Sequence, residues 1–214
     1  MGRLIVIEGL DGAGKRTLAD GLTAELSRRG RSVARVAFPR YDADVHAELV
    51  AEALRGGHGD LGDSVHGMAV LYALDRRGAA DALRVDLETH DVVLLDRYVA
   101  SNAAYGAARL HQDAQGDFVA WTEELEIKRF ALPRPDLQLL LQVPTEVAAG
   151  RAAHRERTEA ERQRDNFESD ASLQERCGEV YAQLAERNWW SPWRVVSGVG
   201  QVDFAELADV VMAA

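Results

Sequence analysis

Residues 9–17, GLDGAGKRT, have the composition of a loop that binds nucleotide phosphates. Glycines allow backbone amides to curl around phosphate oxygens, the start of a helix favours an anion, and Lys15 would reach the β- and γ-phosphates. An apolar run at 4–7 predicts a buried strand before this loop, and leucines at 18, 22 and 26 predict a helix after it. The candidate ATP-binding residues are therefore Gly9, Gly12, Ala13, Gly14, Lys15, Arg16 and Thr17.

The loop departs from the common pattern at Arg16, which stands where a Ser or Thr usually follows the lysine and holds Mg²⁺. Thr17 comes one residue later. One interpretation is a degenerate loop that binds nucleotide poorly. The other is that Arg16 supplies a fixed cation near the γ-phosphate, as an arginine finger in cis does. Metal binding would then depend more heavily on carboxylates.

Asp96 and Arg97 follow a second apolar run, at 92–95. In P-loop enzymes an Asp at such a strand end holds Mg²⁺ directly or through water. A neighbouring guanidinium can clamp a second phosphate with two parallel hydrogen bonds. The alternative is a purely structural Asp–Arg pair at the end of a strand.

Aromatic and polar side chains elsewhere predict a pocket for a nucleoside. Tyr72 and Arg76 are four residues apart and share a helix face, so a ring could stack on a base while a guanidinium bonds its edge. Taken alone, Tyr72 is more typical of a core. The candidate substrate-binding residues are Phe38, Pro39, Tyr41, Tyr72, Arg76, Ser101, Asn102 and Tyr105.

Residues 151–164 alternate arginine with glutamate. Such a run is usually a solvated helix face with ion pairs. However, Arg151, Arg155 and Arg162 share a face by spacing, as a lid that closes over phosphates requires. We favour the lid because a phosphate loop is already present. Asp165 and Glu168, just beyond it, would reach sugar or metal.

The order of predicted elements indicates an α/β fold. Predicted strands at 4–7, 32–38, 92–95, 137–143 and 193–196 alternate with helical segments. This alternation predicts a parallel five-stranded sheet with helices on both faces. Ligands of such sheets bind at the carboxyl ends of the strands, where the polar groups above all lie. We see no linker, and expect a single domain over 1–214.

Composition excludes several other classes of protein. The net charge of −10 argues against nucleic-acid binding, which needs a basic surface. No stretch approaches the roughly 18 apolar residues of a membrane span. The single cysteine, Cys177, rules out a disulfide within the chain. We therefore expect a cytoplasmic protein that binds neither nucleic acid nor membrane.

Taken in order, these segments resemble the thymidylate kinase family across nearly the whole chain. The similar blocks are GLDGAGKRT (9–17), FPRY (38–41), YALDR (72–76), DRYVASNAAY (96–105), LPRPD (132–136) and RQRDNFE (162–168). The resemblance implies a P-loop NTPase fold of the nucleoside monophosphate kinase type with an arginine-rich lid at about 151–164. It also implies Mg²⁺ as cofactor and a homodimer. The Arg16 variant is similar to the mycobacterial and related actinobacterial branch.

The resemblance further implies a role for each matched residue. Asp11 would hold the deoxyribose 3′-hydroxyl and help to place Mg²⁺, and Arg97 would position the acceptor phosphate with Phe38 and Tyr41. Tyr72, commonly Phe in the family, would stack on thymine, whose polar edge Arg76 and Asn102 would bond. The implied catalytic residues are Asp11, Lys15, Arg16, Asp96, Arg97, Arg155 and Arg162. Of these, Arg155 and Arg162 would close over ATP. The implied metal ligands are Asp11, Asp96 and Glu168, and Asp165 would bind substrate. Phe167 stands where close actinobacterial relatives have Tyr, which bears on the exclusion of a ribose 2′-hydroxyl.

The implied reaction is ATP + dTMP giving ADP + dTDP, for dTTP synthesis. The acceptor phosphate, with a second pKa of about 6, is already largely ionised near neutral pH, so no general base is required. A deoxynucleoside kinase is the nearest alternative and would need a carboxylate base such as Asp42 or Asp44. A non-catalytic nucleotide-binding switch, with Arg16 marking lost metal chemistry, is a second alternative.

Overall fold

The computed structural model describes the backbone of residues 1–158 and 170–214, and the side chains of residues 1–152 and 170–214. One sheet of five strands forms its centre, in the order β2-β3-β1-β4-β5. Every neighbouring pair is parallel, which confirms the predicted sheet. The strands are β1 (Arg3–Glu8), β2 (Val33–Ala37), β3 (Val92–Asp96), β4 (Leu137–Gln142) and β5 (Trp193–Ser197).

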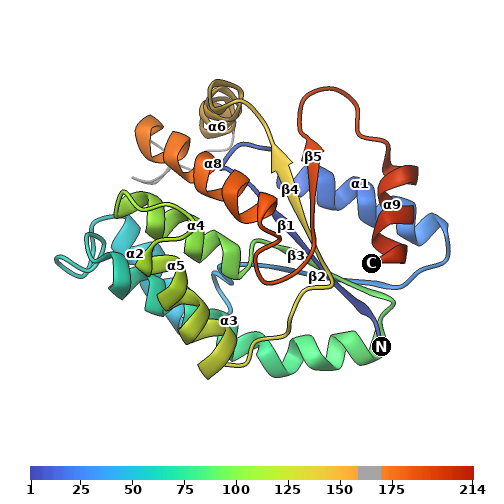
Figure 1. Ribbon diagram of the computed structural model, residues 1–214, viewed down its shortest axis with the longest axis horizontal. Coiled ribbons are helices and arrows are strands. Elements are labelled where there is room, and N and C mark those ends of the chain that lie inside the picture. The colour runs from blue at the N-terminus through green and yellow to red at the C-terminus, as the bar shows by residue number, and fades with distance from the viewer. Residues whose placement is uncertain (159–169) are drawn as a thin grey trace.

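Helices connect these strands and cover both faces of the sheet, with α1 and α9 on one side and α4, α5 and α8 on the other (Figure 1). Among the described residues, no helix is long and apolar enough to span a membrane. The described helices are α1 (Lys15–Arg28), α2 (Val45–Leu54), α3 (Val65–Thr89), α4 (Val99–Arg109), α5 (Asp117–Thr122), the π-helix η1 (Glu123–Arg129), α6 (Thr145–Thr158), α8 (Ala171–Glu186) and α9 (Phe204–Ala213).

The central strands are apolar on both faces because both faces are covered. Ile5 and Ile7 of β1 lie in the same buried cluster as Leu22 of α1. Val6, which points to the opposite face, lies in a second cluster with Leu83 of α3. This alternation along one strand is what the two-residue period of a strand requires.

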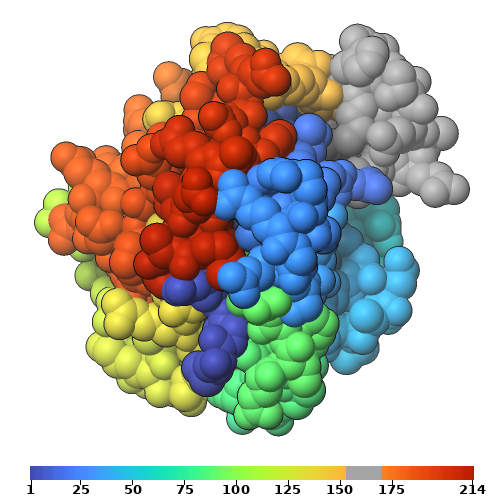
Figure 2. Space-filling model, turned by 90° about the vertical axis from the view of Figure 1, so that its right-hand side faces the viewer, coloured from blue at the N-terminus to red at the C-terminus, as the bar shows by residue number. Residues whose placement is uncertain are grey.

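The C-terminal helix α9 lies beside α1 on the surface of the molecule, as Figures 1 and 2 both show. Gly21 permits this approach, because a Cβ atom there would lie 2.1 Å from the ring of Phe204. The Arg29 guanidinium also donates to the Ala205 carbonyl at 2.8 Å. This packing holds the helix that carries the end of the phosphate loop against the sheet.

Strand register brings the polar strand ends together at one edge of the sheet. Asp96, the last residue of β3, pairs with Ile7 of β1 and with Ala37 of β2. Glu8, the last residue of β1, pairs with Leu140 of β4. The segments that follow β1, β2 and β3 therefore begin side by side, as expected for a site at the carboxyl edge.

The helical region between β3 and β4 is interrupted. It breaks after Arg109 and resumes at Asp117. Beyond α5, however, Glu123–Arg129 winds as a π-helix. One buried residue of this π-helix, Glu126, takes part in the site described below.

Candidate functional site

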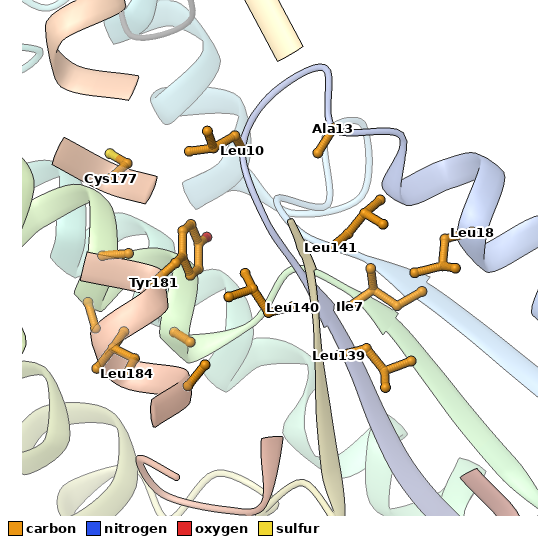
Figure 3. Packing of buried hydrophobic residues seen from close by; sticks show 14 of the residues in the cluster. Ile7, Leu10, Ala13, Leu18, Leu139, Leu140, Leu141, Cys177, Tyr181 and Leu184 are labelled. Carbon is orange, nitrogen blue, oxygen red and sulfur yellow. The ribbon is translucent and has the colours of Figure 1, made fainter. Parts of the chain in front are cut away.

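The glycine-rich loop connects β1 to α1 and is shaped by positive backbone φ angles. Gly9, Gly12 and Gly14 have φ of 145°, 77° and 100°, a region that favours glycine. A Cβ atom at Gly12 would lie 2.1 Å from the carbonyl oxygen of Ala148 in α6. Figure 3 shows Leu10 of the loop pointing toward α8, while the strand beneath it is packed by core leucines. The loop is therefore both bent and closely packed.

The Lys15 side chain folds back over this loop. Its ammonium donates to the carbonyl oxygens of Gly9 at 3.1 Å and Leu10 at 2.9 Å. Burial and the nearby Arg97 lower the pKa of Lys15 to about 8, against the opposing effect of three carboxylates, Asp11, Asp96 and Glu8. The amine is therefore a cation at neutral pH but a weakened one, positioned where phosphates would bind.

Asp11, in the loop, joins Lys15 to the end of β3. One of its oxygens pairs with the Arg97 guanidinium, and the other accepts from the Tyr105 hydroxyl at 2.6 Å. Burial alone would raise the pKa of Asp11, but the Arg97 and Lys15 cations outweigh it and lower the pKa to about 2. The Arg97 guanidinium also lies over the Tyr105 ring, 5.4 Å from its centroid. The structure thus brings together three of the predicted catalytic residues.

Glu8 is a buried carboxylate that contacts Arg97 through Ser101, and the sequence did not predict its role. One Glu8 oxygen accepts from the backbone N–H groups of Tyr98 (2.9 Å) and Ser101 (3.2 Å), at the start of α4. The other accepts from the hydroxyls of Ser101 (2.6 Å) and Tyr181 (3.0 Å). Burial raises the pKa of the Glu8 carboxyl, against these hydrogen bonds and the charge of Arg97. Ser101 in turn accepts from Arg97 Nη1 at 3.1 Å.

The backbone at Arg97 has a positive φ of 66°, uncommon for a residue other than glycine. Its N–H donates to the Ile7 carbonyl at 2.9 Å, so the bend is fixed to the end of β1. This conformation directs the side chain back across the sheet edge toward Asp11. Strain of this kind is found where a site requires a particular side-chain direction.

Asp96 is one of the carboxylates predicted to hold Mg²⁺. It is partly exposed at the sheet edge, and its side chain has no hydrogen-bond partner between residues 1 and 152 or after 169. The described side chains include no cluster of three His, Cys, Asp or Glu residues that could hold a metal by themselves. Mg²⁺ usually takes one or two carboxylates together with water and substrate phosphates. Asp96 with Asp11 would be such a pair.

The segment after β2 is anchored by ion pairs. The Phe38 ring is buried and packs on Tyr98, with centroids 5.9 Å apart, while Tyr41 is 45% exposed. Arg40 donates to the buried Asp75 at 2.7 Å and to Asp44 at 2.8 Å. Pro39 follows a cis peptide bond. Phe38 and Tyr41 thus differ in access: one stabilises the segment and the other faces solvent.

Asp44 is already engaged, which bears on the deoxynucleoside kinase alternative. Its side chain caps α2 through the His46 N–H at 2.8 Å and pairs with Arg40. Although burial raises it, these contacts lower the pKa of Asp44 below its usual value. A carboxylate held ionised in this way is a poor general base for a sugar hydroxyl.

Arg76 and Asn102 converge on a carboxylate that the sequence analysis missed. Glu126 accepts from Arg76 Nε at 2.6 Å and Nη2 at 2.7 Å, and from the Asn102 amide at 2.7 Å. All three side chains are buried. Burial would lower the pKa of Arg76, but the Glu126 charge raises it overall. Tyr72, one turn before Arg76, is partly buried against a small apolar cluster in which Val50 and Met68 lie.

The remaining candidates lie at the start of α1 and in the lid. Arg16 and Thr17 are both exposed. Arg151, at the start of the arginine-rich segment, donates to the loop carbonyl of Ala13 at 3.0 Å and to Gly198 at 3.1 Å. The Arg155 side chain and the residues Arg162, Asp165, Phe167 and Glu168 lie outside the part of the chain that the structure describes.

The fold and this loop together define a class of protein. A parallel sheet in this order, with a glycine-rich loop between β1 and α1, is the fold of the P-loop kinases. The Asp11–Arg97 pair beside the loop, with Arg76 and Asn102 further along α3 and α4, fits the nucleoside monophosphate kinase type within that class.

Comparison with known proteins gives the family. The family model described as thymidylate kinase matches residues 7–194. The thymidylate kinase of Mycobacterium tuberculosis (strain ATCC 25618 / H37Rv) is 52% identical over 96% of this chain and 95% of its own length. A probable thymidylate kinase of Thermococcus onnurineus is 34% identical over 93% and 91%, and the thymidylate kinase of Xanthomonas oryzae pv. oryzae is 38% identical over 86% and 72%. The chain belongs to the thymidylate kinase family.

Proposed function

We propose that this protein transfers the γ-phosphoryl group of ATP to dTMP, giving ADP and dTDP. Membership of the thymidylate kinase family supports the reaction. The observation that carries the assignment within the site is the Asp11–Arg97 pair, which sets a second cation beside the phosphate loop. A monophosphate acceptor needs that cation, whereas a hydroxyl acceptor would need a free base instead.

The mechanism depends on positioning and charge neutralisation. Backbone amides of the loop and Lys15 would hold the ATP phosphates, with Arg16 and the lid arginine Arg155 as further cations. Arg97 would hold the dTMP phosphate, and Asp11 the 3′-hydroxyl of its sugar. Mg²⁺, on Asp96 and Asp11, would neutralise charge on the transferred group. Because the acceptor phosphate is already ionised, no residue needs to remove a proton.

For the base, two atoms support a thymine assignment. Arg76 Nη1 is a donor and Asn102 Oδ1 an acceptor, and neither has a hydrogen-bond partner in the described part of the chain. Thymine offers an acceptor at O4 and a donor at N3, which complements this pair. Tyr72 lies on the same face of α3 as Arg76 and would stack on the ring.

Turnover of an acceptor panel tests the proposal. ADP release from ATP and Mg²⁺ should be fastest with dTMP among dTMP, dUMP, CMP, AMP and thymidine. Strong turnover of thymidine would favour the deoxynucleoside kinase. Another monophosphate as the best acceptor would overturn the base assignment, and ATP binding without any turnover would indicate a switch.

We also infer a cytoplasmic homodimer that takes ATP and dTMP and does not bind nucleic acid. The family resemblance supports the dimer, and the net charge of −10 supports the absence of nucleic-acid binding. Light scattering tests the dimer: the 23.5 kDa mass of a single chain at working concentrations would contradict it.

The lowered pKa of Lys15 predicts proton uptake when nucleotide binds. In the protein without nucleotide, Lys15 loses its proton above about pH 8, because burial and Arg97 disfavour the charge. Bound phosphates would restore the charge, so binding at pH 9 should take up close to one proton per site. Calorimetry of ADP binding in buffers with different ionisation enthalpies measures this number. Lys15→Arg, which stays charged, is the control and should show none; equal uptake by both proteins would contradict the prediction.

A further inference from the structure

The buried carboxylate of Glu126 touches both residues assigned to the edge of the base. We propose that Glu126 is a positioning residue that sets the hydrogen-bond polarity with which Arg76 and Asn102 recognise a base. The site then takes a pyrimidine with a 4-oxo group and an N3–H, and rejects a 4-aminopyrimidine. This inference rests on the proposed function and concerns the specificity of the same site.

The orientation of the Asn102 amide follows from its two neighbours. Its nitrogen lies 3.0 Å from the Ala69 carbonyl oxygen and 2.7 Å from Glu126 Oε1. Both neighbours are acceptors, so both amide hydrogens are used. A flipped amide would set its oxygen against two oxygens in a buried environment. Asn102 Oδ1 is therefore held as an acceptor on the opposite side.

The same carboxylate fixes Arg76. Two parallel hydrogen bonds, at 2.6 and 2.7 Å, engage Nε and Nη2 and leave Nη1 as the remaining donor. Guanidinium has no acceptor, so this side of the site can only donate. Glu126 thus presents a donor on Arg76 beside an acceptor on Asn102, and prevents the acceptor from turning into a second donor.

The two classes of pyrimidine differ at the atoms concerned. Thymine and uracil present an acceptor at position 4 and a donor at N3, which complement a donor beside an acceptor. Cytosine presents the reverse, an amino donor at position 4 and an acceptor at N3. It would place donor against donor and acceptor against acceptor. Sites that hydrogen-bond a substrate group reject mismatched analogues strongly, since buried partners remain unpaired.

Glu126 reaches these partners from the buried face of the π-helix η1. Its side chain is fully buried, whereas Glu123 and Glu124 of the same π-helix are 40% and 46% exposed and pair with Lys128. Of the three glutamates of η1, Glu126 alone faces inward, where it meets residues 24 and 50 positions away in the chain. π-Helical turns are frequent at functional sites.

The test compares dTMP with 5-methyl-dCMP, which retains the methyl group and reverses the polarity. Glu126→Gln keeps the shape but turns one acceptor into an N–H₂ donor. Arg76 then loses one of its two hydrogen bonds in either orientation of the new amide, and Asn102 also loses its partner when the NH₂ replaces Oε1. We expect kcat/KM for dTMP to fall by about ten- to a hundredfold, chiefly through KM, because buried donors or acceptors become unpaired. Turnover of 5-methyl-dCMP should change little, so the ratio of the two kcat/KM values should fall at least about tenfold.

Controls separate this role from a structural one. Glu124→Gln makes the same chemical change at an exposed position of η1 and should leave the ratio unchanged. Glu126→Asp keeps the charge but is too short to reach both partners, so it should also lower the ratio. This variant replaces Glu126→Gln in the test if circular dichroism shows that Glu126→Gln is unfolded. An unchanged ratio in either folded Glu126 variant overturns the inference. A wild-type protein that fails to use dTMP would instead overturn the proposed function itself.

Discussion

Replacing Arg97 by alanine is expected to lower kcat by about a thousandfold or more, while ATP binding stays close to that of the wild-type protein. The guanidinium is the one described cation paired directly with the loop carboxylate Asp11. It lies beside Lys15 without being part of the phosphate loop. Its loss would leave the acceptor phosphate misplaced and its developing charge uncompensated. Single-turnover kinetics with dTMP, together with ATP binding measured by calorimetry, checks the two parts separately.

The structure offers a matched control for this experiment. Arg35 forms an ion pair with Asp20 at 2.6 Å, and both side chains are well exposed, 38% and 56%. Arg35→Ala removes a guanidinium of the same size and should change stability by less than about 1 kcal/mol and turnover hardly at all. Near-full activity of Arg97→Ala would contradict the assigned role. A loss of ATP binding equal to the loss of turnover would show that Arg97 supports the loop instead.

Arg97→Lys refines the interpretation. Lysine restores the charge but not the two-pronged geometry through which Arg97 reaches both Asp11 and Ser101. We expect kcat between those of the alanine variant and the wild-type protein. In the alanine variant the carboxyl of Asp11 loses the charge that most lowers its pKa, so the pKa of Asp11 should rise.

The three central strands were predictable because each is a short and largely apolar run. The expected strand at 4–7 is Arg3–Glu8, and that at 92–95 is Val92–Asp96. Such runs are typical of strands that are buried on both faces, as the central strands of a parallel sheet are. The order of the three central strands could not be derived from these runs, since all three are apolar alike. The edge strands β2 and β5 differ from them, because they carry Arg35 and Arg194 and are only partly buried.

The site was predictable where its residues carry a local signal. The glycines and Lys15 occur at a fixed spacing, and Asp96 and Arg97 follow a strand end. Glu8 and Glu126 carry no such signal. Glu8 is bonded by residues 90 to 173 positions away, and Glu126 by Arg76, 50 positions away. A glutamate beside an apolar run looks the same whether it ends a strand in solvent or accepts hydrogen bonds in the core.

Gly12→Ala is expected to abolish ATP binding and to lower the free energy of unfolding by several kcal/mol. Two costs add. A φ of 77° disfavours any Cβ by about 1–2 kcal/mol. The added atom would also lie 2.1 Å from the Ala148 carbonyl oxygen, and overpacking of this kind costs about 1–3 kcal/mol. Because the obstacle is helix backbone, the loop or α6 must move, and either movement alters the amides that would hold phosphate.

Gly30→Ala separates the two costs. Gly30 has nearly the same φ, 76°, but nothing lies within 4 Å of the position of its Cβ atom, and it follows α1 far from the loop. This variant should lose only about 1–2 kcal/mol of stability and keep wild-type affinity for ATP. Thermal unfolding and nucleotide binding of both variants give the comparison. If Gly12→Ala behaved like Gly30→Ala in both measurements, the prediction would be wrong. The close contact between the loop and α6 would then neither destabilise the variant nor affect ATP binding.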